Sequence, residues 1–198
     1  AQAGYPVIIG SRSSEKAALA AEKIRTTNCA NAVEGTDNQT AAAQGDIVVI
    51  TVPFSSHAEI LENIKGAVSE KIVVDTTVPL MPPKVGTVQL PSAGSAALIT
   101  YGILGDIAEV VSAFQNVAAH KLHDTQVIDC DVLVCGNKKA ARETVIGLVE
   151  ALGMRGLHAG PIANSVATEA LSSVLIVINK NYNVADAGLK ITGHLRIS

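Results

Sequence analysis

The 198-residue chain has 48% hydrophobic residues, 17% charged residues and a net charge of −3, a composition that excludes an intrinsically disordered protein. Its 15 basic and 18 acidic side chains form no basic cluster, so we expect no nucleic-acid partner. The apolar content is mostly Ala, Val, Ile and Leu, which is typical of a parallel sheet covered by helices.

Short apolar runs alternate with helical patterns in the first half of the chain. Residues 7–9 form an apolar run that ends at Gly10 and predicts a strand. Ser13 or Ser14 then begins a helix that runs to about Arg25. The other elements expected here are a weak strand at 32–35, a short helix at 38–44, a buried strand at 46–52 that Pro53 ends, a helix capped by Ser55 or Ser56, and a strand at 71–75.

The second half opens with a loop at 79–94, whose four prolines indicate a segment long enough to act as a lid or a crossing. The elements expected after it are a helix at 95–104, a strand at 109–114, a strand at 131–134 leading to Gly136, a helix at 138–152 closed by Gly153, a strand at 155–158, and helical structure from 162 onward. This alternation predicts an α/β fold, a doubly wound Rossmann-type parallel sheet with helices on both faces and a helical C-terminal segment.

A doubly wound sheet that binds a dinucleotide carries a G-x-G-x-x-G loop after its first strand. This sequence has no such loop, because Gly4 and Gly10 lie on either side of a predicted strand. Residues 1–4 resemble the last turn of a helix, and residues 7–9 resemble a second strand. We therefore expect a first strand–loop–helix unit of about 20 residues to be missing, with open strand edges, reduced stability and weak dinucleotide binding as the result.

The corner after residues 7–9 reads Gly10-Ser11-Arg12-Ser13, where an NAD-binding fold has an acidic residue for the ribose hydroxyls. Arg12 can pair with a 2′-phosphate, Ser11 can donate to it, and Lys16 adds a second positive charge one turn into the helix. This pattern favours NADP over NAD. A capped helix start with a solvated Arg12 explains the same residues, and the sequence leaves both interpretations open.

The strand at 46–52 leads into Thr51-Val52-Pro53-Phe54, at the edge where doubly wound sheets bind their ligands. Phe54 can cover a nucleotide ring there, although a surface Phe after a terminated strand is the structural alternative. Val78 and Pro79 follow the next strand and form a similar edge of the same cleft.

The chain resembles the NADPH-dependent reductases of the deazaflavin coenzyme F420. The stretches that carry the resemblance are Ile8-Ile9-Gly10-Ser11-Arg12 with Glu15-Lys16-Ala17, Thr51-Val52-Pro53, Val110-Val111-Ser112-Ala113-Phe114, residues 131–136, residues 159–165 and Gly188-Leu189-Lys190-Ile191. They occur in order along essentially the whole chain, which makes the resemblance far more specific than any single motif.

The resemblance implies direct hydride transfer between C4 of the nicotinamide of NADPH and C5 of the deazaflavin, with no catalytic side chain and no metal. NADP and coenzyme F420 are then the small-molecule partners. The positions that match the family are Ser11, Arg12 and Lys16 for the 2′-phosphate, Thr51, Val52, Pro53 and Phe54 for the loop over NADP, Gln115, Asn116, Val117 and Ala118 for the turn between the two rings, and Leu189 for an apolar contact. The sequence departs from the family pattern at two places. Some family members have His at the position of Gln115, and the glycine loop that should hold the pyrophosphate is missing.

On this interpretation, residues 1–114 form the NADP-binding portion and residues 115–198 a smaller α/β portion for the deazaflavin and for dimer contacts. The helix from 162 to 178 has a broader apolar face than one small domain needs, so we expect a homodimer there, unless the face packs on its own sheet. Two alternatives remain: an NADPH-dependent reductase of a small imine or keto substrate, and a non-catalytic nucleotide-binding remnant.

The remaining residues give weaker signals. Three cysteines and no basic or apolar leader fit a cytoplasmic protein. The longest apolar stretch, 166–178, is interrupted by Thr, Glu and Ser, so we expect it to be too short and too polar to span a membrane. His57 is expected on the surface of a first helical turn, His158 at a strand end, and Asp75 is a candidate acid or base.

Overall fold

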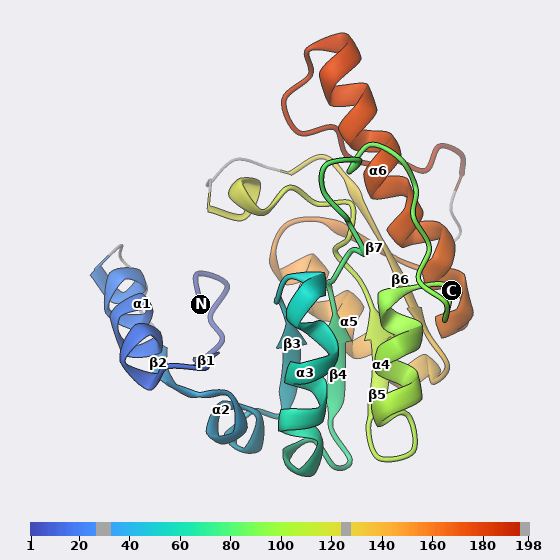
Figure 1. Cartoon of the computed structure of the whole chain (residues 1–198). Coiled ribbons are helices and arrows are strands. Elements are labelled where there is room, and N and C mark those ends of the chain that lie inside the picture. The colour runs from blue at the N-terminus through green and yellow to red at the C-terminus, as the bar shows by residue number, and fades with distance from the viewer. Residues whose placement is uncertain (27–32, 124–127, 195–198) are drawn as a thin grey trace.

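The computed structural model describes residues 1–26, 33–123 and 128–194, and its elements are shown in Figure 1. The strands form two sheets, a two-stranded sheet β1-β2 and a five-stranded sheet in the order β3-β4-β5-β6-β7. The strands are β1 (Val7–Ser11), β2 (Val33–Asp37), β3 (Ile47–Ile50), β4 (Ile72–Asp75), β5 (Glu109–Ser112), β6 (Asp131–Gly136) and β7 (Arg155–His158). The helices are α1 (Ser14–Thr26), α2 (Asn38–Gln44), α3 (Phe54–Ile64), α4 (Ala96–Leu104), α5 (Lys139–Ala151) and α6 (Ser165–Tyr182), with short 3-10 turns η1 (Lys65–Ala67), η2 (Ala119–His123) and η3 (Ile162–Asn164).

The N-terminal unit is a parallel pair of strands with one helix packed against it. β1 and β2 pair in register from Val7 to Ser11, and α1 packs against them through its buried alanines, Ala17 and Ala21. A Cβ atom at Gly35 would lie 2.2 Å from the carbonyl oxygen of Ala17, so only glycine lets the helix approach β2 this closely. These elements match the predicted first half, although residue 32 lies outside the described residues.

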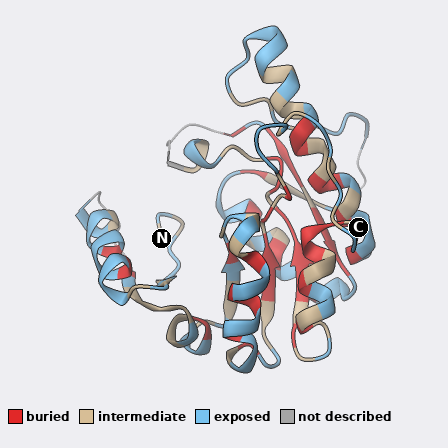
Figure 2. Cartoon of the chain, in the orientation of Figure 1, coloured by how far each residue is buried: buried red, intermediate tan, exposed pale blue. Residues whose placement is uncertain are grey.

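Helices cover both faces of the five-stranded sheet, as the alternating pattern predicted. One core cluster joins β3, β4 and β5 to α3 and α4, with Leu61, Val73 and Leu104 fully buried. The second cluster lies on the other face and joins β4, β5 and β6 to α5 through Val111, Val134 and Val145. Figure 2 shows that buried residues follow the central strands, whereas the N-terminal unit is largely exposed.

The sheet is parallel except at one pair of strands. β5 and β6 are antiparallel, with Val111 opposite Gly136 and Ser112 opposite Cys135. A parallel strand would need a crossover of a dozen or more residues, usually a helix. The described part of the β5–β6 connection carries only the 3-10 turn η2 and no α-helix that would serve as such a crossover.

The predicted cap of α3 is wrong. α3 begins at Phe54 with Pro53 at the N-cap position, and neither Ser55 nor Ser56 caps it. Pro53 has φ −58°, which proline fixes close to the helical value, and it has no N–H that would need a partner. β3 accordingly ends at Ile50, two residues before the predicted limit.

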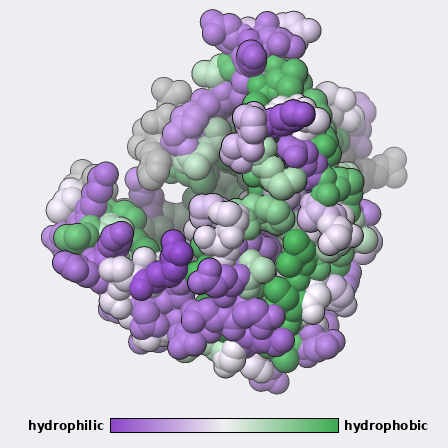
Figure 3. All heavy atoms as spheres, in the orientation of Figure 1, coloured by the Kyte–Doolittle hydropathy of each residue, from purple (hydrophilic) through white to green (hydrophobic). Residues whose placement is uncertain are grey.

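α6 buries polar residues and exposes apolar ones. Its buried residues are Ser165, Thr168, Glu169, Ser172 and Ser173, whereas Val174 and Val177 are 45% and 38% exposed. On the face in view in Figure 3, hydrophobic residues gather over α4 and along α6. By length and composition alone the helical span 162–182 is long enough to cross a bilayer, which corrects the expectation that it is too short.

A groove separates the N-terminal unit from the main sheet. It has a volume of about 570 Å³ and is lined on one side by residues 5–10 and on the other by residues 44–52. Among the described strands, β1 and β3 are not hydrogen-bonded neighbours of each other, and Val49 on β3 is 47% exposed. Two strand edges therefore face the groove without a strand between them.

A strand placed in this groove should stabilise the protein. We expect an N-terminal extension carrying an apolar strand, a G-x-G-x-x-G loop and a helix to raise Tm by about 5–10 °C, because each kcal/mol shifts Tm by about 2–4 °C in a chain of this size. Calorimetry measures the shift. The control is the same extension with lysines in place of the apolar strand residues, and equal Tm values for the two extensions would contradict the prediction.

Candidate functional site

The carboxyl ends of three parallel strands lie in register and bring the predicted loops together. Ile50 of β3 pairs with Asp75 of β4, which pairs with Ser112 of β5. Thr76 donates from its backbone N–H and from its hydroxyl to the carbonyl of Ile50, at 3.2 and 2.8 Å. The segments 51–54, 76–79 and 113–118 therefore leave the sheet side by side, as the sequence predicted for this edge.

The turn after β5 has an unusual backbone. Phe114 has φ 72°, a left-handed conformation that is rare for a bulky residue, and the carbonyl of Phe114 accepts from the N–H of Val117 at 3.1 Å. Such conformations persist where the surroundings fix them and often occur at functional sites. The fixing contacts come from the next two residues.

Gln115 and Asn116 point into the protein. The amide of Gln115 donates to the carbonyl of Asp75 at 2.8 Å and to the hydroxyl of Ser112 at 2.9 Å. The amide of Asn116 donates to the carbonyl of Thr168 at 3.0 Å and to the hydroxyl of Ser172 at 3.2 Å. These side chains anchor the turn. Val117 and Ala118 are half-buried, and Val117 packs against the second core cluster.

His57 and Asp75 form a buried pair, which corrects two predictions. His57 is 1% exposed, and its Nε2 lies 2.8 Å from Oδ2 of Asp75 and 3.0 Å from the hydroxyl of Thr100. Thr100 donates to the same carboxylate oxygen, and Oδ1 accepts from the N–H of Thr77 at 2.9 Å. Asp75 is fully buried with both oxygens occupied, so it is not an acid or base that a ligand can reach.

The burial of His57 had a signal in the sequence. His57, Ile60, Leu61 and Ile64 follow the i, i+3, i+4, i+7 spacing of one helix face, and all four are buried. Nδ1 of His57 and the hydroxyl of Thr77 are the buried side-chain atoms without a hydrogen-bond partner in the part of the chain that the structure describes.

Glu169 of α6 caps a different helix. Its carboxylate accepts from the N–H groups of Ala96 and Ala97, at 2.6 and 3.0 Å, in the first turn of α4. Beside it the hydroxyls of Ser95 and Ser165 lie 2.7 Å apart. Burial raises the pKa of Glu169 to about 7, because the loss of water outweighs the two N–H groups that favour the charged form.

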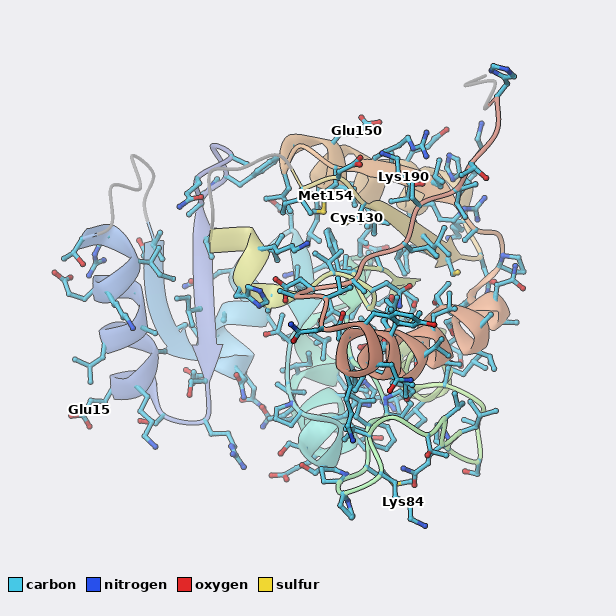
Figure 4. All side chains as sticks on the ribbon, turned by 90° about the horizontal axis from the view of Figure 1, so that it is seen from above. Glu15, Lys84, Cys130, Glu150, Met154 and Lys190 are labelled. Carbon is cyan, nitrogen blue, oxygen red and sulfur yellow. The ribbon has the colours of Figure 1, made fainter. Side chains whose placement is uncertain are left out.

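The predicted phosphate corner lies on the N-terminal unit. The hydroxyl of Ser13 accepts from the N–H of Lys16, and the hydroxyl of Ser11 accepts from the N–H of Ser13, both at 3.3 Å. Arg12 and Lys16 are exposed, and neither forms an ion pair with another described residue. Their neighbour Glu15 lies across the molecule from Lys190 and Cys130 in Figure 4, so the corner and the C-terminal segment occupy opposite ends of the site.

The C-terminal segment meets the turn after β5. The carbonyl of Leu189 accepts from the N–H of Asp131 at 2.7 Å. Asp131 in turn lines a small crevice together with residues 114–117 and 132–133. Leu189 is therefore linked to the turn through Asp131, and its role as an apolar contact for the deazaflavin stays a prediction.

The remaining predicted residues are less available. Phe54 is half-buried, with its ring centroid 6.1 Å from that of His57, and Val78 is half-buried. Pro79 is buried, so its side chain is less accessible to a ligand than the sequence predicted. Thr51 and Pro53 are exposed at the strand edge, with Val52 half-buried between them.

Comparisons with known proteins agree with this geometry. The family model described as NADP oxidoreductase, coenzyme F420-dependent, matches residues 1–79. The F420-dependent NADP reductase of Methanocaldococcus jannaschii is 35% identical over 94% of this chain and 87% of its own length. That of Methanothermobacter thermautotrophicus is 34% identical over 97% of this chain and 86% of its own length.

A solved structure supports the same relationship. The crystal structure of a candidate F420-dependent NADP reductase from Arthrobacter sp. FB24 is 25% identical, with a TM-score of 0.78. The match covers 96% of this chain and 90% of that one, so it includes both sheets and the C-terminal helix.

Glu169 should make the free energy of unfolding depend on pH. The folded state binds the Glu169 proton more tightly than the unfolded chain, so this contribution is complete below pH about 4.5 and is lost as the pH rises through about 7. The loss amounts to about 3 kcal/mol. Urea unfolding between pH 5 and 8 should show it in the wild type, and Glu169→Gln should remove it.

The matched control for this prediction is Glu150→Gln, because Glu150 is an exposed carboxylate on α5. The free energy of unfolding of Glu150→Gln should depend on pH as that of the wild type does. If the free energy of unfolding of Glu169→Gln keeps the wild-type slope against pH, another group titrates.

Proposed function

The chain belongs to the family of F420-dependent NADP reductases, and on that premise we propose that it transfers a hydride between NADP(H) and coenzyme F420. The single observation that carries the proposal is the turn after β5, held by a buried network at the edge where the strand ends and the C-terminal segment meet. It rests on Phe114 in a left-handed conformation and on the inward amides of Gln115 and Asn116.

The adenosine end of NADP fits the corner at Ser11, Arg12 and Lys16. Two exposed cations without carboxylate partners among the described residues can pair with a dianionic 2′-phosphate. The N–H groups at the start of α1 add donors of the same kind. In a doubly wound fold the pyrophosphate lies on a glycine loop, so the strand–loop–helix extension described above should also tighten NADP binding.

The nicotinamide end fits the strand edge between segments 51–54 and 76–79, with Phe54 and Val78 as its half-buried apolar walls. The 115–118 turn follows β5, the strand next to β4. It lies between this edge and Asp131, the residue that Leu189 contacts. We place the deazaflavin between that turn and Leu189. The division into an NADP-binding portion at 1–114 and a deazaflavin-binding portion at 115–198 follows from this placement.

When both are bound, the two ring systems supply the redox chemistry themselves, by hydride transfer between nicotinamide and deazaflavin. The protein's residues hold the two faces at contact distance and keep water out. A rigid turn does this better than a mobile one, which explains why five side-chain hydrogen bonds fix Gln115 and Asn116.

The two alternative functions are less favoured. Three curated relatives that match nearly the whole chain at 30–35% identity are all named F420-dependent NADP reductase. A small imine or keto substrate finds no acid or base at this edge, since Asp75 is buried and fully hydrogen-bonded. A non-catalytic remnant would not require so constrained a turn.

We also propose a cytoplasmic homodimer formed through α4 and α6. α6 exposes Val174 and Val177, and Tyr101 of α4 is 41% exposed. Hydrophobic residues gather over α4 and along α6 in Figure 3. A second copy of the chain offers a face of matching chemistry. Sedimentation velocity at neutral pH gives the mass that tests this.

Purified protein mixed with NADPH and coenzyme F420 tests the main proposal. Oxidation of NADPH and loss of the deazaflavin absorbance should proceed one to one. NADPH oxidation by a cyclic imine or a keto acid, without any reaction with coenzyme F420, would instead favour the first alternative.

Arg12→Asp should abolish the preference for NADP. The variant loses a charge-assisted pair and adds repulsion, which should cost on the order of 2–4 kcal/mol in NADP affinity and much less in NAD affinity. Titration calorimetry with both nucleotides measures the difference. Lys23→Asp makes the same type of charge change at the exposed end of α1 and should leave both affinities unchanged; equal losses for the two nucleotides in Arg12→Asp would contradict the phosphate assignment.

Val117→Trp should place a wedge between the two rings. Transfer needs the reacting atoms about 3–3.5 Å apart, so the turnover rate should fall steeply while NADP still binds through its adenosine end. Stopped-flow mixing and NADP titration separate the two effects. Leu19→Trp, at an exposed position on α1, is the control, and full turnover by Val117→Trp would place the hydride path elsewhere.

A further inference from the structure

The last described segment of the chain folds back over the start of β6. α6 ends at Asn183 in a left-handed conformation, and residues 184–191, here named the C-terminal strap, return toward the sheet. Several contacts fasten the beginning of the strap, among them an ion pair between His120 and Asp186 and a hydrogen bond from the N–H of Val184 to the carbonyl of Asn179. The N–H of Ala187 donates to Oδ1 of Asn179 at 2.8 Å, and Lys121 donates to the carbonyl of Asp186 at 3.0 Å.

An ion pair fastens the other end of the strap. Arg155 of β7 donates from Nε to Oδ1 of Asp131 at 2.7 Å and from Nη2 to Oδ2 at 2.6 Å, a two-point geometry that is among the strongest in proteins. The same two groups hold Ile191. Oδ2 of Asp131 accepts from its N–H at 2.6 Å, and Nη2 of Arg155 donates to its carbonyl at 2.9 Å.

The pair is more than a surface salt bridge. Asp131 is 2% exposed, so its charge has lost most of its water and depends on these partners. The guanidinium of Arg155 is the largest cause that holds the pKa of Asp131 below its usual range. By contrast, the neighbouring pair between Lys190 and Asp129 has exposed side chains on both sides.

Leu189 lies between the contacts at residues 186–187 and those at Ile191. Its carbonyl accepts from the N–H of Asp131, and a Cβ atom at Gly188 would lie 2.8 Å from the Cβ of Cys130, so the strap is pressed onto the start of β6. Asp131 also lines the crevice beside the 115–118 turn. Asp131 is thus both the anchor of the strap and a direct neighbour of the turn.

We propose that Asp131 and Arg155 are a positioning pair that sets the affinity for the deazaflavin by holding the strap, and with it Leu189, on the start of β6. The pair touches neither ring and acts through the strap. The inference rests on the proposed function, which places the deazaflavin between that turn and Leu189. The phosphate corner at Arg12 lies on the other sheet, so NADP affinity does not depend on the pair.

The experiment compares three variants of the full chain. Arg155→Met keeps the length of the side chain and removes every donor, whereas Asp131→Asn keeps one acceptor oxygen for the N–H of Ile191 and removes the charge. Lys190→Ala removes the exposed ion pair of the same strap and is the matched control. Steady-state kinetics with each substrate varied, NADP titration and hydrogen exchange of the strap amides are measured for all three.

We expect the KM for coenzyme F420 to rise about tenfold in Arg155→Met and less in Asp131→Asn, the size of effect given by loss of a charge-assisted hydrogen bond. The Kd for NADP should change less than about twofold, and exchange at residues 187–191 should speed up by about the same factor as KM rises. Lys190→Ala should match the wild type in all measurements. A general loss of stability would not raise the KM for coenzyme F420 while leaving the Kd for NADP unchanged.

Three outcomes overturn the inference. One is an unchanged KM for coenzyme F420 in an active Arg155→Met variant, and another is an equal loss of affinity for both substrates. The third is unchanged exchange in the strap, which does not depend on activity and also applies to Asp131→Asn if Arg155→Met does not fold. A wild-type chain that neither binds nor reduces coenzyme F420 would instead overturn the proposed function, and the affinity role with it.

Discussion

The buried carboxylate of Asp75 is the interaction on which the rest of the site depends. A buried carboxyl group needs hydrogen bonds on both oxygens, because a buried polar group without a partner costs free energy. Asp75 obtains them from His57 of α3, from Thr100 of α4 and from the backbone of Thr77. Both helices on that face are thereby tied to the last residue of β4. Gln115 donates to the carbonyl of the same residue, so the turn after β5 is fixed to the point where the helices meet.

This polar centre explains why α6 faces the sheet with its hydrophilic side. Thr168 and Ser172 receive the amide of Asn116, and Glu169 closes the first turn of α4. A helix that supplies these partners turns its valines outward, which leaves an apolar surface that a second copy can cover. Satisfying the buried network and leaving an outward apolar face are therefore two consequences of one helix orientation.

The two ends of the proposed site belong to different parts of the architecture. The corner at Arg12 is on the two-stranded unit, and the turn and the strap are on the five-stranded sheet. The groove between β1 and β3 separates the two parts. On the proposed placement, a dinucleotide that spans both parts must bridge this groove, so its affinity would depend on how firmly the N-terminal unit is held. The proposed deazaflavin side would depend instead on the contacts of Asp131 and Arg155 with the strap.

The sequence by itself determined the order and type of the elements up to α6, the alignment of loops at the strand ends and the family, because periodicity and motifs are local or linear signals. The prediction of helical structure after Tyr182 is wrong, because residues 183–194 are not helical. The burial of His57 is also encoded locally, in the spacing of one helix face. The antiparallel entry of β6, the inward amides of Gln115 and Asn116, the orientation of α6 and the fastening of the strap were decided only by the tertiary structure. In each case the deciding partner lies far away in the chain, as Thr168 does for Asn116 and Ile191 for Asp131. Whether a polar side chain is an anchor or a ligand contact depends on which distant groups packing brings within hydrogen-bond reach, and no local pattern records that.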